Sequence, residues 1–302
     1  MKLAVRLPNW VGDACMALPA LRALAERDIE LHLFGKGWAA DLFAAHGWPV
    51  SKLPAGLWPA STCVRAIGAE RGLLLTNSFG SALQWRLAGV RAVGYRREGR
   101  TLLLGRSLPR PRGRHEVEVF WRLAQEVTTW LGLPPMPAQP PQALGLQLTE
   151  AHQQAAEEAL RGSGVHSPFV VLCPLAAGTI NGQSKVWPAF ALLSRLIQER
   201  GLPGVACPGP GEEAACAAAL PGARLLPGLA LGAYAAICSR ALITVANDSG
   251  PMHLAAAVDA PVIGIFGIGD PQRTRPWSTH GRVIGDAVTW PTATTVMRAL
   301  DL

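Results

Sequence analysis

Apolar residues in the first half of the chain follow two alternating patterns, short continuous runs and longer stretches with helical spacing. The short runs predict strands at residues 3–7, 29–34, 73–76 and 92–95. The longer stretches predict helices at residues 15–27, 38–46, 81–88 and 116–130. Strands that alternate with helices in this way are typical of a parallel sheet covered by helices.

The second half repeats the alternation after a first helix at residues 150–161. Apolar runs predict strands at residues 169–173, 204–207, 242–245 and 262–266. Helical spacing predicts helices at residues 187–200, 212–219, 233–239 and 251–258. A second parallel α/β sheet is therefore expected.

A proline-rich segment, residues 133–142, separates the halves and holds five prolines. Proline fixes φ and removes a backbone donor, so this segment is expected to be a stiff connector. The sequence thus predicts an α/β protein with two Rossmann-like domains, residues 1–142 and 143–302. Ligands of such folds bind beyond the carboxyl ends of the strands, so two parallel sheets facing a central cleft should carry their chemistry on the loops that follow the strands.

Composition narrows the class of protein. The 302 residues are 49% hydrophobic and 16% charged, which is ordinary for a globular protein and excludes a disordered one. Apolar runs stop far short of the roughly 20 residues that span a bilayer, and Arg6, Asn9 and Asp13 interrupt any signal-peptide core, so a cytoplasmic location is expected. The six cysteines form no C-x-x-C pair and are expected to be buried hydrophobes, with no disulfide framework or zinc site.

The positive charge is concentrated in one half. Residues 1–143 hold 18 Lys and Arg against 10 Asp and Glu, whereas the remainder holds 10 against 11. Nine arginines lie between Arg86 and Arg114, with Glu98 the only acid among them. This stretch is either a solvated face or a surface for an anionic acceptor or membrane. No nucleic-acid recognition pattern accompanies the arginines, so nucleic acid is not an expected partner.

The loop after the first predicted strand, residues 7–13, ends in Gly12 and Asp13 where a helix begins. It has no G-x-G-x-x-G pattern, which disfavours a dinucleotide site. Asp13 at this place is either a helix-capping carboxylate or a general base in the cleft.

Three loops of the second half could bind a nucleotide. Residues 174–188 combine small residues with Lys185 before a helix, as a phosphate-binding loop would, although a solvated loop has the same composition. Residues 245–253 bring Asp248, Ser249 and Gly250 to another helix start, and His253 is either a ligand or a structural histidine. In residues 208–213, Glu212 or Glu213 could bind a ribose or compensate a helix dipole.

Four motifs occur in a consistent order: N-W-V-G-D at residues 9–13, K-V-W-P at 185–188, N-D-S-G-P-M-H-L-A-A-A at 247–257 and F-G-I-G-D-P at 266–271. Together they resemble the lipopolysaccharide heptosyltransferases of glycosyltransferase family 9, and most closely the heptosyltransferase II branch. The resemblance implies a GT-B fold and an inverting, metal-independent transfer from ADP-heptose to the anionic lipopolysaccharide core, with no cofactor, at the cytoplasmic face of the inner membrane.

The resemblance also implies roles for individual residues. Asp13 would be the catalytic base. The resemblance implies that the first domain binds the acceptor, where Asn9 and Gly12 are candidates, and the excess of positive charge in this half adds Arg96, Arg97 and Arg100. The second domain would bind the donor through Thr179, Lys185, Glu212, Glu213, Leu229, Asp248, Ser249, Gly250 and His253.

Two departures leave alternatives open. Ile268 and Gly269 replace a proline and a hydroxyl residue of the family motif, and the cysteine-bearing insert that many heptosyltransferase II proteins carry near their end is missing. The alternatives are a related transferase with another nucleotide-sugar, a protein or another surface glycan as acceptor, a non-catalytic sugar-nucleotide-binding protein, and an enzyme like the UDP-N-acetylglucosamine 2-epimerases.

Overall fold

The computed structural model describes residues 1–97, 99–166 and 168–301, so Glu98 lies outside the described residues. The chain forms two compact units, Met1–Pro141 (unit 1) and Gln142–Leu302 (unit 2). Their border lies one residue before the border that the prolines predict.

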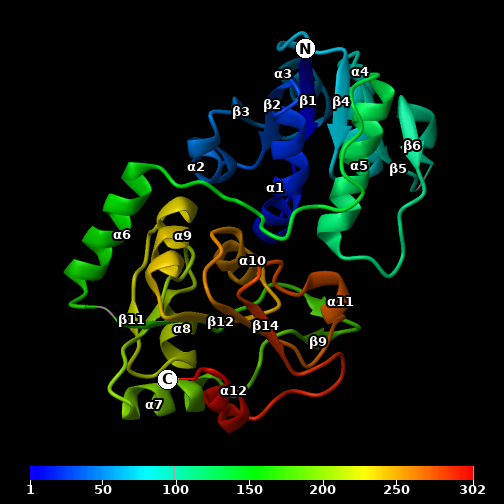
Figure 1. Cartoon of the computed structure of the whole chain (residues 1–302). Helices are drawn as coiled ribbons and strands as arrows, with labels where there is room; N and C mark the ends of the chain where they lie inside the picture. Colours follow the sequence, from blue (N-terminus) through cyan, green and yellow to red (C-terminus); the bar gives the residue numbers. More distant parts are fainter. Residues whose placement is uncertain (98, 167, 302) are drawn as a thin grey trace. The chain divides into compact units, whose positions relative to one another are not determined.

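Unit 1 is a six-stranded, fully parallel sheet in the order β3-β2-β1-β4-β5-β6 (Figure 1). Its elements along the chain are β1 (Lys2–Arg6), α1 (Val11–Ala25), β2 (Glu30–Gly35), α2 (Ala39–Leu42), η1 (Ala44–His46), β3 (Val50–Lys52), α3 (Leu57–Arg65), β4 (Arg71–Leu74), α4 (Phe79–Leu87), β5 (Arg91–Tyr95), η2 (Arg100–Leu103), β6 (Arg106–Leu108) and α5 (Glu116–Trp130). The chain leaves β1 toward β2 and leaves β4 in the opposite direction toward β5. Unit 1 therefore has a topological switch point between β1 and β4.

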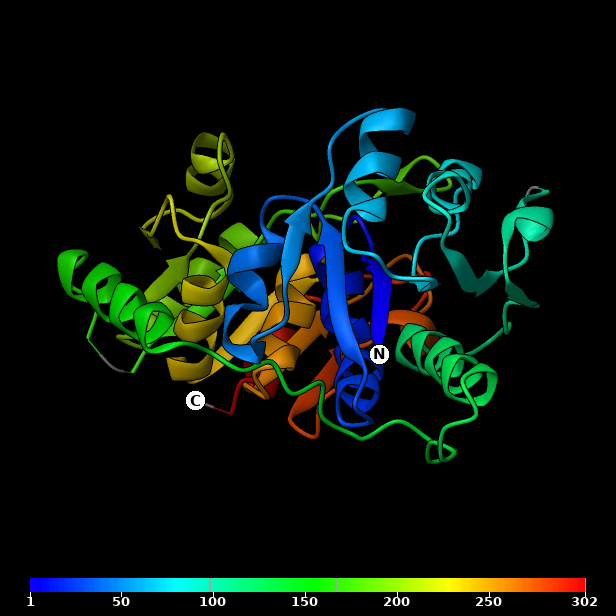
Figure 2. The ribbon, with the colours of Figure 1, turned by 90° about the horizontal axis from the view of Figure 1, so that it is seen from above.

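The helices of unit 1 cover the sheet on two sides. Helix α1 packs against α5, whereas α3 packs against α4 and α4 against η2. Figure 2 shows the light-blue α3 and the cyan α4 on one side of the sheet, away from the dark-blue α1. Trp85 of α4 fills the core below α3 and α4, and its indole N–H donates to the carbonyl oxygen of Ala4 at 3.3 Å. Gly72 leaves room for this ring, since a Cβ there would lie 2.8 Å from Trp85 Cδ1.

Unit 2 contains a second six-stranded parallel sheet in the order β11-β10-β7-β12-β13-β14, and a separate antiparallel pair, β8-β9. Its elements are α6 (Glu150–Gly162), β7 (Val170–Cys173), β8 (Thr179–Ile180), β9 (Gln183–Ser184), α7 (Phe190–Glu199), β10 (Gly204–Ala206), α8 (Glu213–Ala219), β11 (Arg224–Leu225), α9 (Leu231–Arg240), β12 (Ile243–Asn247), α10 (Gly250–Ala257), β13 (Val262–Ile265), α11 (Pro271–Thr274), β14 (Gly281–Ile284) and α12 (Ala293–Ala299). The switch point of this sheet lies between β7 and β12.

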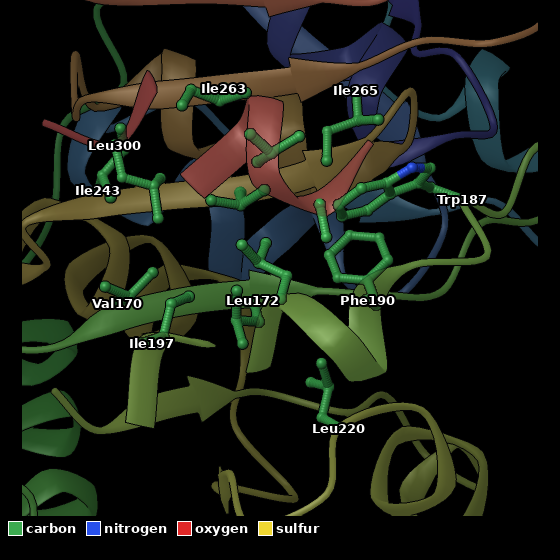
Figure 3. Close-up of a cluster of buried hydrophobic side chains, with 14 of the residues drawn as sticks. Val170, Leu172, Trp187, Phe190, Ile197, Leu220, Ile243, Ile263, Ile265 and Leu300 are labelled. Atoms are coloured by element: carbon green, nitrogen blue, oxygen red, sulfur yellow. The ribbon is translucent and has the colours of Figure 1, made fainter. Parts of the chain in front are cut away.

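The core of unit 2 follows the two-residue period of its strands. Val170 and Leu172 of β7 point to the same face as Ile263 and Ile265 of β13, where they meet residues of α7 and α12 (Figure 3). Trp187 closes this core at one end, and its indole N–H donates to the carbonyl oxygen of Pro291 at 2.9 Å. The strands are buried on both faces, as continuous apolar runs predict for a parallel sheet.

The predicted α/β class with two parallel sheets is confirmed, but several short elements were not predicted. The edge strands β3, β6, β11 and β14 have only two to four residues each, too few to show a period. The helix expected at residues 38–46 is broken into α2 and the 3₁₀ turn η1. The helix expected from residue 187 begins only at Phe190, with Ala189 as its N-cap, and the backbone N–H of Trp187 donates to Asn247 Oδ1 instead.

The cysteines largely fit their predicted role. All six are free thiols, and Cys15, Cys173, Cys216 and Cys238 are buried. Burial, with smaller contributions from Glu212 and Glu213, raises the pKa of the Cys216 thiol to about 11.

In the described part of the chain, no helix is long and apolar enough to cross a bilayer. Nor do its His, Cys, Asp and Glu side chains form a group of three that could hold a metal ion.

Candidate active site

Unit 1 has a pocket of about 370 Å³ at its topological switch point. The loops that follow β1 and β4 form most of it, and Arg97 after β5 adds to its lining. The lining residues are Pro8, Asn9, Trp10, Asp13, Leu75, Thr76, Asn77, Ser78 and Arg97. The N-W-V-G-D motif thus lies where a ligand of a parallel sheet is expected.

Asp13 lies in the first turn of α1 and is half-buried at the pocket wall. The N-cap residue of α1 is Trp10, and no side chain caps the helix there. Asp13 is therefore inside the first turn and not at the N-cap, and it lines the pocket. Its role as a general base stays a prediction. Gly12 is buried beside it, and Asn9 Oδ1 accepts a hydrogen bond from Arg6 Nη2 at 2.8 Å.

The three candidate arginines of unit 1 have different environments. Arg97 is exposed and lines the pocket, and the exposed Arg96 donates to the hydroxyl and carbonyl oxygens of Ser107, both at 3.3 Å. Arg100 is fully buried and donates from Nη1 to the carbonyl oxygen of Thr76 at 2.7 Å. The prediction that Arg100 presents its charge to an acceptor is therefore wrong. Arg100 instead holds the backbone of Thr76, a residue of the pocket wall.

The sequence interpretation missed Thr76, Asn77 and Ser78, which line the pocket after β4. Ser78 is the N-cap of α4, where its hydroxyl accepts from the backbone N–H of Ser81 at 3.2 Å. Asn77 Oδ1 is buried with no hydrogen-bond partner among the described residues. The sequence did offer a signal for this loop, because Ser78 stands between an apolar run and a predicted helix, where an N-cap is expected.

In unit 2, Lys185 and Asp248 meet at the switch point between β7 and β12. Lys185 Nζ lies 2.8 Å from Asp248 Oδ2, and the two side chains are only 18% and 9% exposed. One follows β9 and the other follows β12, so the fold brings together two residues that are 63 positions apart. An ammonium group held at a strand edge next to a helix start suits an anionic ligand.

Asn247 holds this arrangement in place. It is fully buried, its Oδ1 accepts from the backbone N–H of Trp187 at 2.9 Å, and its Nδ2 donates to the carbonyl oxygen of Pro174 at 2.7 Å. One amide therefore fixes both ends of the loop that carries Lys185. The sequence shows Asn247 only as the first letter of a motif, because its partners lie far away along the chain.

The loop between Pro174 and Trp187 contains the β-hairpin β8-β9, which was not predicted. Asn181 and Gly182 have φ values of 51° and 78°, as the turn of a two-residue hairpin requires. Thr179 is exposed on the first strand of the hairpin. The Asn-Gly pair was the available signal.

Gly269 explains one departure from the family motif. Its φ is +91°, and a Cβ there would lie 2.9 Å from Ile180 Cδ1 and 3.7 Å from Asp248 Oδ2. The loop after β13 therefore approaches both the hairpin and the ion pair at a residue without a side chain. Any larger residue would push the hairpin away or strain the backbone.

Three donor candidates, Ser249, Gly250 and His253, lie at the start of α10. Ser249 occupies the N-cap position, but its hydroxyl donates to the carbonyl oxygen of Asn247 at 3.2 Å and makes no cap bond. Gly250 is the first helical residue and is half-buried. His253 is buried, which favours the structural alternative over direct contact with a ligand.

The remaining donor candidates lie on the other side of β7. Glu212 and Glu213 follow β10, and Leu229 follows β11. Glu212 Oε2 accepts from the backbone N–H of Gly209 at 2.9 Å and closes its own turn, whereas Glu213 is exposed and Leu229 is half-buried. A ribose-binding role stays a prediction for these three residues.

A family model described as glycosyltransferase family 9 (heptosyltransferase) matches residues 62–299. The chain belongs to this family. It is therefore a glycosyltransferase of the heptosyltransferase type, which excludes the epimerase alternative.

Similar proteins agree with the family assignment. The chain is 28% identical to lipopolysaccharide heptosyltransferase 2 of Escherichia coli K12, over 94% of this chain and 88% of that protein. The solved structure of E. coli ADP-heptose lipopolysaccharide heptosyltransferase II superposes with a TM-score of 0.81 at 25% identity, covering 100% of this chain and 98% of that one. The structure of E. coli heptosyltransferase WaaC with ADP has the same fold, with a TM-score of 0.74 at 22% identity, covering 100% and 99%. The GT-B fold is thereby confirmed.

Proposed function

We propose that this family 9 enzyme transfers a heptose from ADP-heptose to the inner core of lipopolysaccharide. The similar E. coli proteins are named for this donor and this acceptor. The observation that carries the proposal is the ion pair of Lys185 and Asp248 at the switch point of unit 2. It supplies one cation for a diphosphate and one carboxylate for sugar hydroxyls.

Lys185 would bind the diphosphate together with Thr179 and the first amides of α10. A diphosphate offers several charged oxygens to the ammonium group, and each bond is charge-assisted like the Lys185–Asp248 bond that it would replace. Asp248 would then accept hydrogen bonds from the sugar hydroxyls. Glu212, Glu213 and Leu229 would contact the nucleoside.

The proposed reaction inverts the anomeric carbon in one displacement. Asp13 accepts the proton of the acceptor hydroxyl, whose oxygen forms the new bond to the anomeric carbon. The bond from this carbon to the diphosphate oxygen breaks, and ADP leaves with the electron pair. Lys185 and the α10 amides oppose the charge that develops on the leaving diphosphate, which is the role a metal ion has in other transferases. We therefore propose that the reaction needs no metal.

Unit 1 would bind the anionic acceptor. Arg97 lines the same pocket as Asp13, and Arg96 lies next to it in the chain, so acceptor phosphates would be drawn toward the base. The donor would be taken from the cytoplasm, at the inner face of the inner membrane.

Incubation with a panel of nucleotide-sugars and truncated core acceptors, followed by mass spectrometry, tests the proposal. We expect a product heavier than the acceptor by one heptose residue, formed from ADP-heptose only and also in the presence of EDTA. Proton NMR of the product gives the anomeric configuration. A product from another nucleotide-sugar, loss of activity with EDTA, or retention of configuration would each overturn the corresponding part.

A further inference from the structure

Unit 1 exposes large apolar side chains on three neighbouring elements. Trp58 of α3 is 66% exposed, Phe79 of α4 is 44% exposed and Leu102 of η2 is 91% exposed. In unit 2 the described large apolar side chains of this exposure are Leu192, Leu242 and Val288, none of them aromatic. Single exposed apolar residues are ordinary, but a group on adjacent elements indicates a contact surface.

The three elements are joined side by side. Helix α4 packs against both α3 and η2, and Gln84 Nε2 of α4 donates to the carbonyl oxygen of Gly56, the N-cap of α3, at 3.3 Å. Buried Arg100 ties η2 to the β4–α4 loop through the carbonyl oxygen of Thr76. The elements that carry Trp58, Phe79 and Leu102 are therefore neighbours, and η2 is bonded to the loop that lines the Asp13 pocket.

Cations lie at the same edge of the sheet. Lys36 follows β2, Lys52 ends β3, and Arg96 follows β5, and all three side chains are exposed. Since the strands are parallel, their carboxyl ends share one edge with the pocket. Lys36 Nζ also lies 5.5 Å from the ring centroid of Trp10, a pocket residue.

We infer that these six residues, Trp58, Phe79, Leu102, Lys36, Lys52 and Arg96, form a rim that docks the enzyme on an anionic lipid bilayer. Exposed tryptophan, phenylalanine and leucine enter the headgroup region, while lysine and arginine attract anionic headgroups. The excess of eight positive charges in residues 1–143 matches such a surface in sign.

The inference deepens the proposed function, since it rests on an acceptor that is anchored in a bilayer. A docked rim would hold the Asp13 pocket at the height of the headgroups. It would keep the enzyme on the surface where its acceptor lies, and it would raise the rate of encounter without changing the chemistry at Asp13.

Vesicle sedimentation of the full chain tests the rim without any sugar substrate. We expect binding to vesicles of phosphatidylethanolamine and phosphatidylglycerol, and much weaker binding to phosphatidylcholine vesicles. Leu102→Glu should reduce partitioning to the anionic vesicles about tenfold, because it removes an apolar contact and adds repulsion. Trp58→Ser should act in the same direction.

Val288→Glu is the matched control, because Val288 is 82% exposed in unit 2 and a charge there should not change partitioning. The high exposure of Leu102 keeps its variant foldable, which the melting temperature checks. Transfer to a soluble, delipidated acceptor should be unchanged in Leu102→Glu. If that transfer is absent even in the wild type while vesicle binding still depends on Leu102, the proposed function fails and the rim stands.

Three outcomes would overturn the rim. In the first, the wild type binds both kinds of vesicle equally weakly. In the second, Leu102→Glu binds anionic vesicles as strongly as the wild type and the control Val288→Glu do. In the third outcome, the protein would form a dimer that Leu102→Glu dissociates, with no vesicle binding, so that a second copy covers the rim.

Discussion

At the scale of single residues, Asp13 has the position that a general base needs, in a pocket wall and not at the N-cap. Asp13→Asn keeps the size and much of the hydrogen bonding of the side chain but cannot accept a proton. We expect kcat to fall by about 10² to 10⁴, the usual contribution of a general base, with little change in the affinity for ADP. Steady-state kinetics and calorimetry measure the two quantities. Near-normal turnover would show that Asp13 has only a structural role.

The candidate arginines of unit 1 differ in burial, since Arg96 and Arg97 are exposed and Arg100 is buried. Arg96→Ser with Arg97→Ser should raise the acceptor KM, most strongly at low ionic strength, and change the free energy of unfolding by less than about 0.5 kcal/mol. Arg100→Ser should instead destabilise unit 1 by about 1 to 3 kcal/mol, because it leaves the carbonyl oxygen of Thr76 without its buried donor. Denaturant unfolding should therefore show the larger loss of stability in Arg100→Ser, whereas the acceptor KM should rise more in the Arg96→Ser, Arg97→Ser variant.

At the scale of elements, the loop from Pro174 to Trp187 depends on Asn247. Asn247→Asp can still accept from Trp187 N–H but cannot donate to the carbonyl oxygen of Pro174. We expect a rise in the donor KM of several fold with a smaller change in kcat, because the loop that holds Lys185 loses one of its anchors.

Lys185→Ala is the comparison for this loop. It should weaken ADP binding by about 1.5 to 3 kcal/mol, the scale of a charge-assisted hydrogen bond, without loosening the loop. Hydrogen exchange separates the two effects, because only Asn247→Asp should speed exchange in the hairpin. Equal exchange in both variants would mean that Asn247 does not anchor the loop.

At the scale of the whole molecule, the proposed roles divide between the two units. ADP should slow hydrogen exchange in the unit 2 loops that follow β7, β12 and β13, and leave the pocket loops of unit 1 unchanged. At 100 times the dissociation constant, amides that exchange only from the unliganded state should slow by about 100-fold. Protection confined to unit 1 would reverse the assignment of donor and acceptor domains.

The sequence by itself determined the α/β class, because alternating apolar runs and helical spacings are local signals. Five prolines in one segment likewise marked the border between the units, and motif spacing identified the family. The hairpin at Asn181 and Gly182 was also within reach of the sequence, since its turn signal is local.

Only the tertiary structure decided which of these residues meet. Strand order places the switch points between β1 and β4 and between β7 and β12, and parallel pairing depends on contacts that no local pattern encodes. For the same reason the sequence could not show that Lys185 pairs with Asp248, or that Asn247 fixes both ends of a loop. The charge of Arg100 suggested a surface residue, but its burial under Gly94 and beside Thr76 is a property of packing. Local periodicity gives the elements, whereas side-chain contacts between distant strands create the site.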